Sequence, residues 1–156
     1  MIYLLAALIG VVAGLRAMTA PAALAWGAWL GCISLAATPF AFLGSIWAVG
    51  ILSLLAVGEL VSDQLPATPS RKVPVQFGTR LLMGGVTGAA IGAMADMLVP
   101  GLIAGMVGAV IGTYAGAAAR ATLARGFGRD RPAALIEDAV AIGGAALIVL
   151  ALARPL

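Results

Sequence analysis

The sequence predicts an all-α, polytopic membrane protein, and three observations lead to that fold class. Apolar residues make up 63% of the 156 residues and charged residues only 10%, whereas a soluble domain has about 45–50% and about 25%. The apolar residues fall into about six segments separated by short interruptions, and most arginines lie in those interruptions. Arginine-rich connections are typical of the cytoplasmic loops of membrane proteins. We therefore expect residues 1–156 to form a single integral membrane domain.

The first two apolar segments are short. They cover residues 2–15 and about 22–37, with Arg16, Thr19 and Pro21 between them. One continuous helix over both would measure about 54 Å at about 1.5 Å per residue, which is too long for one span, so the chain must turn between them. Thr19 is placed to cap the helix that follows. The pair is either two short spans or one re-entrant hairpin buried by the other helices.

The other four segments are long enough to span a bilayer, which takes about 17–25 helical residues. They cover about 41–61, 77–97, 101–119 and 133–153. The connections over 64–76 and 120–132 are both basic and lie two spans apart. Both are therefore expected on the cytoplasmic side, and the turns near Pro39 and Asp96 on the outer side.

Glycine recurs at four-residue spacing in three runs of the fourth and fifth segments: Gly84, Gly88 and Gly92; Gly101 and Gly105; and Gly108, Gly112 and Gly116. Residues four apart share a helix face, and glycine there lets two backbones approach closely. This pattern predicts a tight hairpin of the two segments and favours a homo-oligomer or a larger membrane complex. The strings IGVVAG at 9–14 and IGTYAG at 111–116, with Arg16 and Arg120 further along, are compatible with an inverted repeat of two three-helix halves.

Several charged residues lie inside the apolar segments rather than between them. A charge in the hydrocarbon core costs about 2.5–3.5 kcal/mol, so such residues pair or face water. At similar depth near the cytoplasmic side, we expect one polar cluster made of Glu59, Asp63, Arg80, Arg120, Glu137 and Asp138. Arg16 and Thr19, at the helix break, form a second candidate site. The cluster is open to four interpretations: a structural ion-pair network, a site for a lipid headgroup or anionic substrate, a cation or proton pathway, or a metal-dependent catalytic site.

The sequence contains no histidine and a single cysteine, Cys32. These counts exclude an intrachain disulfide, histidine-ligated haem or zinc, and histidine-dependent nucleophilic catalysis. No catalytic residue, metal site or cofactor is predicted. The net charge of +3 does not indicate nucleic acid binding, because membrane loops account for the basic residues.

Two stretches carry a resemblance to a known family: GLRAMTAPAALAWGAWLG and GELVSDQLPATPSRKVPVQFGTRLLMGGVTGAAIG. The chain resembles the bacterial domain-of-unknown-function family 4126, which consists of small integral membrane proteins. Glu59, Asp63 and Pro66 match a short motif of that family, whereas Gln64 stands where lysine is typical, and Arg71 or Lys72 would have to supply that charge. The resemblance implies a location in the bacterial cytoplasmic (inner) membrane and implies no activity.

These observations favour a small transporter or channel whose charged cluster binds the substrate or a coupling ion. The main alternative is a non-catalytic accessory subunit of a larger membrane complex, which would explain the glycine-rich faces and short loops. A third interpretation, a lipid-acting enzyme with a bound metal, has no recognised motif behind it. Membrane lipids are the remaining expected partners.

Overall fold

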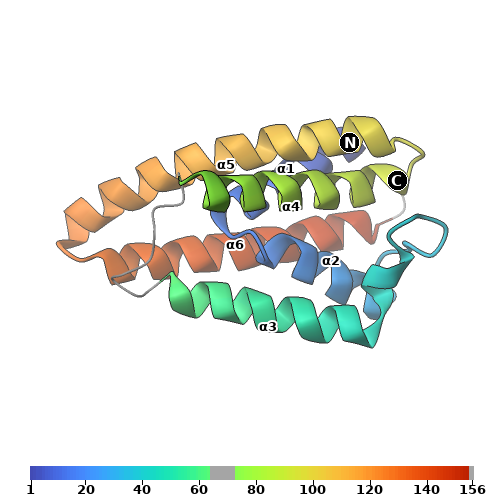
Figure 1. Cartoon of the computed structure of the whole chain (residues 1–156), viewed down its shortest axis with the longest axis horizontal. Coiled ribbons are helices and arrows are strands. Elements are labelled where there is room, and N and C mark those ends of the chain that lie inside the picture. Colours follow the sequence, from blue (N-terminus) through green and yellow to red (C-terminus); the bar gives the residue numbers. More distant parts are fainter. Residues whose placement is uncertain (64–72, 155–156) are drawn as a thin grey trace.

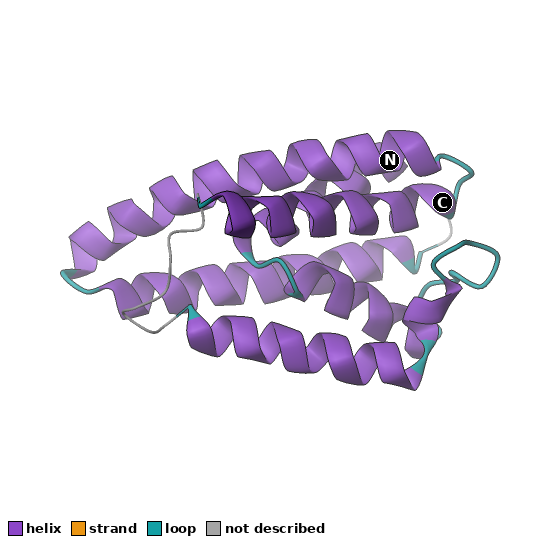
Figure 2. Ribbon diagram, in the orientation of Figure 1, coloured by secondary structure: helices purple, strands orange, loops and turns teal. Residues whose placement is uncertain are grey.

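The computed structural model describes residues 1–63 and 73–154, and the regular elements within these ranges are helices (Figures 1 and 2). The predicted all-α class is confirmed, and the described residues form six α-helices. The motif residues Gln64 and Pro66 and the basic residues Arg71 and Lys72 lie outside the described residues. The elements are α1 (Ile2–Leu15), α2 (Thr19–Trp29), the short 3-10 helix η1 (Ala41–Gly44), α3 (Ile46–Ser62), α4 (Pro74–Ala93), α5 (Leu98–Phe127) and α6 (Asp130–Leu152).

The two N-terminal helices form a hairpin that turns inside the bundle. α1 runs from one end of the molecule toward its middle, and α2 returns toward the same end (Figure 1). Arg16, at the turn, is fully buried, so it does not anchor an interfacial turn. α1 and α2 have 14 and 11 residues, whereas α4 and α5 have 20 and 30. The first two helices of the N-terminal half are therefore much shorter than the first two helices of the C-terminal half. The inverted repeat of the two halves stays a prediction.

α1, α4 and α5 pack on one another through glycine. A Cβ atom built on Gly105 would lie 2.9 Å from the Cα of Gly88 on α4, closer than real side chains come. A Cβ atom on Gly14 of α1 would lie 2.7 Å from the backbone nitrogen of Thr113 on α5. The predicted tight packing of α4 on α5 is confirmed. Glycines at the contact also bring α1 close to α5, which the sequence pattern did not predict.

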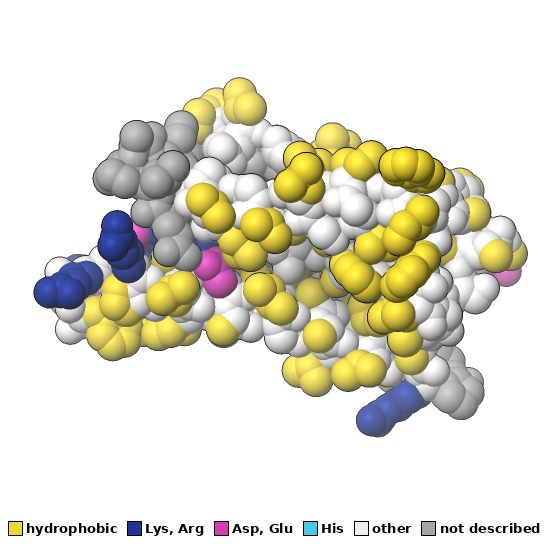
Figure 3. Space-filling view, turned by 90° about the horizontal axis from the view of Figure 1, so that it is seen from below, with side chains coloured by type: hydrophobic (Ala, Val, Ile, Leu, Met, Phe, Trp, Pro, Cys, Tyr) yellow, Lys and Arg dark blue, Asp and Glu magenta, His cyan; other side chains and the backbone are white. Residues whose placement is uncertain are grey.

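The remaining helices cover this group unequally. α6 packs against α1, α2 and α5, whereas α3 packs mainly against α2 and η1. Of the 17 residues in α3, Val49 is the buried one. Trp47 and Leu54 on its outer face are 76% and 74% exposed. Figure 3, seen from below, shows apolar side chains spread over the middle of this face and basic ones gathered mostly at one end.

Two segment ends differ most from the prediction. α2 ends at Trp29, well before residue 37, and Gly31 adopts a positive φ of 74° in the turns that follow. α5 continues to Phe127, past the predicted end at 119, because alanine and arginine favour helix. It stops where Gly128, with φ 64°, takes the left-handed conformation common at helix ends. Arg120 and Arg125 therefore lie on a helix and not in a loop.

The helix directions agree with the predicted alternation. The end of α3, the start of α4 and the α5–α6 turn lie at one end of the molecule, and the α4–α5 turn and η1 lie at the other (Figure 1). Among the described helices, α5 and α6 are the two that are long and apolar enough to cross a membrane, and α1 and α3 are shorter apolar helices.

Candidate functional site

The C-terminal end of α1 lies inside the bundle, where water cannot satisfy its free carbonyl groups. Arg80 on α4, which is 1% exposed, donates from Nη1 to the carbonyl oxygens of Gly14 at 2.8 Å and Leu15 at 2.5 Å. The hydroxyl of Thr113 on α5 also donates to Gly14, at 3.3 Å. The C-terminal end of a helix carries a partial negative charge, so a guanidinium group is the complementary partner.

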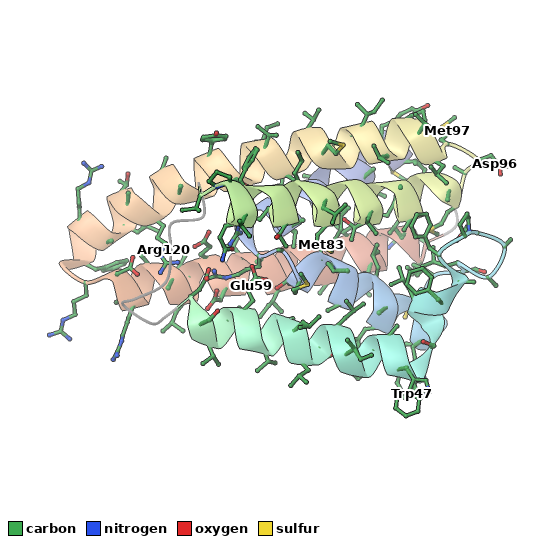
Figure 4. The ribbon with its side chains drawn as sticks, in the orientation of Figure 1. Trp47, Glu59, Met83, Asp96, Met97 and Arg120 are labelled. Carbon is green, nitrogen blue, oxygen red and sulfur yellow. The ribbon has the colours of Figure 1, made fainter. Side chains whose placement is uncertain are left out.

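The start of α2 has the opposite arrangement (Figure 4). The backbone amides of Ala17 and Met18 donate to the two carboxylate oxygens of Glu59 on α3, each at 2.8 Å. An anion is the complementary partner here, because the N-terminal end of a helix carries partial positive charge. Glu59 Oε1 also lies 3.4 Å from Nη2 of Arg80. One ion pair therefore joins the groups that cap the two broken helix ends.

Arg16, between the two helices, connects α3 with α6. Its Nε and Nη2 atoms each lie 2.6 Å from Oδ1 of Asp138, and its Nη1 atom pairs with Asp63. Nη2 of Arg80 lies 3.8 Å from Oδ2 of the same Asp63. Asp63 is thus shared by the two buried arginines, which fixes the end of α3 against the helix break.

Arg120 extends the ion pairs toward the α5–α6 turn (Figure 4). Its Nη2 and Nε atoms contact the two carboxylate oxygens of Asp130 at 2.5 Å and 3.0 Å, a bidentate geometry. Its Nη1 atom lies 3.5 Å from Oε2 of Glu137, and Nη2 donates to the backbone carbonyl of Asp63 at 3.1 Å. Glu137 Oε2 is 4.0 Å from Nη2 of Arg16, so the ion pairs form one continuous system.

We call this system the charged cluster; its described members are Arg16, Glu59, Asp63, Arg80, Arg120, Asp130, Glu137 and Asp138. Three guanidinium groups face five carboxylates, so these members carry a net charge of −2 when all are ionised. The side chain of Arg16 is 0% exposed and that of Asp130 is 61% exposed. The cluster therefore reaches from the buried helix break to the surface at one end of the molecule.

The structure brings together seven of the residues singled out from the sequence, including Arg16, which had been assigned to a separate site. Thr19 is not among them: it is 7% exposed, and its hydroxyl has no hydrogen-bond partner among the described residues. Asp130 was missed because residues 120–132 were expected to be a loop. The capped backbone groups of α1 and α2 were missed as well. The side chains that cap them come from α3 and α4, so these are long-range contacts that no local sequence pattern predicts.

The carboxylates of the described residues do not gather into a metal site. Within residues 1–63 and 73–154, no three histidine, cysteine, aspartate or glutamate side chains are placed to hold a metal ion. The four carboxylates Glu59, Asp63, Glu137 and Asp138 contact guanidinium groups instead. This arrangement can hold a helix break together, and its carboxylates are groups that can exchange a proton.

Comparisons with known proteins place the chain in a family. No curated protein and no solved structure matches it. The family described as "Domain of unknown function (DUF4126)" matches residues 3–156, which is nearly the whole sequence and includes every member of the charged cluster. The chain therefore belongs to the DUF4126 family, as the resemblance of its two motif-bearing stretches predicted.

Proposed function

We propose that this protein is a multi-pass protein of the bacterial cytoplasmic membrane and works there as a small transporter or channel. The membrane assignment is supported by the apolar α5 and α6 helices and by large apolar side chains left exposed, such as Trp47, Leu54 and Leu147. Soluble monomers rarely expose apolar patches of this extent. Arg125, Arg129 and Arg131 lie close together in the sequence where α5 meets α6, and such a group of arginines is typical of a cytoplasmic side.

The charged cluster is the observation that supports transport. Ionisable residues inside a membrane bundle commonly mark an ion or substrate pathway. In many transporters the site lies at a broken helix, whose half-helix ends face charged groups. Here Glu59 and Arg80 occupy those positions at the α1–α2 break.

The carboxylates of the cluster favour a proton or a cation as the transported or coupling species. The partly exposed Asp130 leads from the surface to Arg120 and Glu137, which gives a cation a path inward from that end. The carboxylates lack a metal-binding arrangement among the described residues, which favours a proton or a monovalent cation over a divalent metal.

Flux into proteoliposomes tests the proposal. Vesicles with the purified protein, an internal pH dye and an imposed membrane potential should acidify faster than empty vesicles if protons move, and sodium or potassium tracers test the monovalent cations. Glu137→Gln removes one cluster carboxylate and should lower the flux at least about tenfold, since the neutral group cannot stabilise a passing charge. Asp96→Asn is the matched control. Asp96 lies in the α4–α5 turn at the other end with φ 56°, a conformation that asparagine tolerates. Equal flux in empty and loaded vesicles for all three ions would refute the proposal.

The accessory-subunit alternative is favoured by one observation, the loosely packed α3. Little of the surface of α3 is buried against the rest of this chain, as expected of a helix whose apolar outer face docks on a partner. Purification in mild detergent separates the two functions. A subunit should aggregate alone and become monodisperse with co-purified membrane proteins, whereas a self-sufficient transporter should be monodisperse by itself.

A further inference from the structure

A cleft of about 480 Å³ opens between α2, α3 and α6. It exists because α3 packs mainly on α2 and η1 and stands away from α6. The lining residues on α2 begin at Thr19 and reach Leu30, just past the helix end, a length of about 16 Å at about 1.5 Å per residue. Pockets that bind small molecules have volumes of about 300–1,000 Å³. The cleft is therefore large enough for one elongated small molecule.

The walls of the cleft are almost entirely apolar, and none of the described residues that line it is charged. Its polar atoms near the surface bond each other, since Nε1 of Trp26 donates to Oγ of Ser53 at 2.9 Å. Val57 on α3 and Ile142 on α6 line the cleft and are at least half exposed, so apolar surface borders its opening. A charged group inside would lose its water without gaining a partner, which is costly. The occupant that fits these walls is uncharged and soluble in lipid.

Thr19 supplies an unused polar group at the inner end of the cleft. The other buried threonines of the described residues, Thr87 and Thr113, donate their hydroxyl groups to the carbonyl four residues earlier, at 2.7 Å and 2.8 Å. The corresponding carbonyl for Thr19 belongs to Leu15, which accepts from Arg80 instead. Thr19 is 7% exposed, and its hydroxyl has no hydrogen-bond partner among the described residues. Such a hydroxyl is costly, and a ligand group beside it would relieve that cost.

An oxygen acceptor suits this place better than an N–H donor. Thr19 is the first residue of α2, and the N-terminal end of a helix carries partial positive charge. The hydroxyl proton of Thr19 lacks its usual acceptor, and a carbonyl oxygen would provide one. Threonine uses two side-chain rotamers in helices, so the hydroxyl can turn toward a molecule in the cleft.

We propose that the cleft binds a free, uncharged, single-chain lipophilic molecule with a carbonyl group, which accepts a hydrogen bond from Thr19. The hydrocarbon chain lies along α2 between α3 and α6. The volume suits one chain and not a whole two-chain phospholipid. This inference rests on the membrane location in the proposed function and is independent of ion transport.

Tryptophan quenching in nanodiscs of ether-linked phosphatidylcholine, which has no carbonyl groups, tests the binding. Trp26 lines the cleft about 10 Å along α2 from Thr19, whereas Trp47 projects from the outer face of α3 (Figure 4). One variant, Trp29→Phe with Trp47→Phe, keeps only Trp26; the other, Trp26→Phe with Trp29→Phe, keeps only Trp47. The probes are methyl ω-bromodecyl ketone, dodecyl bromide and ω-bromodecyl trimethylammonium. They share a brominated chain and differ in the group at its other end.

The ketone should quench Trp26 saturably. At equal mole fraction in the bilayer, it should bind at least about fivefold more tightly than dodecyl bromide or the ammonium probe, since one neutral hydrogen bond contributes about that factor. Trp47 should report only the unsaturable quenching of probe dissolved in the bilayer. Equal affinity for the ketone and either other probe, or the same quenching curve for both tryptophans, would overturn the proposal.

Removing the hydroxyl tests the assigned hydrogen bond. Thr19→Val keeps the shape of the side chain and should weaken the ketone about fivefold while leaving dodecyl bromide within about twofold. The Tm without ligand should stay equal or rise, because the variant removes an unpaired buried hydroxyl. Thr122→Val is the matched control, since Thr122 is exposed on α5 and bonds its own helix. An unchanged preference for the ketone in Thr19→Val would overturn the role of Thr19.

A pair of matched variants locates the site. Ala146→Phe fills the cleft from α6 and should weaken binding of the ketone at least about tenfold. Ala115→Phe adds the same ring to an exposed position on α5, away from the cleft, and should leave the affinity within about twofold. Equal affinities in the two variants would overturn the location.

Two further arms separate this inference from its neighbours. Replacing the ether-linked lipid by ester-linked phosphatidylcholine should leave the affinity for the ketone within about twofold. A loss of binding would show that a bilayer lipid ester occupies the site and would overturn the assignment to a free molecule. Saturable binding of the ketone without ion flux in proteoliposomes would support the site and refute transport. Ion flux without binding of the ketone would overturn this inference and leave the proposed function in place.

Discussion

Replacing Arg16 with methionine is the sharpest test of how the charged cluster holds the fold. Arg16 is fully buried and contacts Asp138 through two nitrogen atoms at 2.6 Å and Asp63 through a third. Methionine removes the charge and keeps much of the apolar volume. The net charge of the described cluster then changes from −2 to −3, and Asp63 and Asp138 lose their contacts with Arg16. Removing one partner of a buried ion pair costs about 3–5 kcal/mol.

The assay is thermal unfolding followed by circular dichroism in detergent micelles. For a chain of this length, each kcal/mol shifts Tm by about 2–4 °C, so Arg16→Met should lower Tm by about 6–20 °C. Arg125→Met is the matched control, since Arg125 is exposed on α5, and it should change the stability by no more than about 0.5 kcal/mol.

A double variant separates lost charge pairing from lost packing. Arg16→Met with Asp138→Asn removes one of the two carboxylates that lose their contact with Arg16 and returns the described cluster to −2. It should therefore be more stable than Arg16→Met alone, with a coupling energy of at least about 1 kcal/mol. If Arg16→Met matches Arg125→Met, or if the effects of Arg16→Met and Asp138→Asn simply add, the reasoning from buried ion pairs is refuted.

Three further predictions concern packing, helix ends and surface charge, all measured as unfolding free energies. Gly105→Ala should destabilise by about 1–3 kcal/mol because its Cβ would meet the backbone of α4. Gly58→Ala on α3 should instead be neutral or stabilise by up to about 1 kcal/mol, since nothing lies within 4 Å of its Cβ; equal losses at both positions would contradict this contrast. Gly128→Ala should cost about 1–2 kcal/mol through its left-handed φ of 64° alone, and an unchanged stability would show that α5 ends differently. Asp130→Asn should cost less than about 1 kcal/mol, because its pair with Arg120 is exposed, and the cost should shrink in 1 M salt; a larger, salt-independent loss would contradict the observed exposure.

The charged residues near the end of the bundle could be placed from the sequence because helix directions alternate. Once the segments are marked, Glu59, Arg80, Arg120 and Glu137 fall at similar depth whatever the detailed packing. The sequence did not predict that Arg16 would join them. Its place depends on how deep the α1–α2 turn lies, and short apolar segments are equally compatible with two spans or a hairpin.

The sequence by itself determined the helical class, the number of helices and the close approach of α4 to α5, because composition, segment length and glycine spacing are local properties. Tertiary structure alone decided that Arg80 and Glu59 cap the two broken helix ends and that α3 stands away from α6. These features depend on how each helix is rotated about its axis. Helices that are apolar on all sides carry no periodic signal for that rotation, so only the assembled bundle fixes which side chains meet.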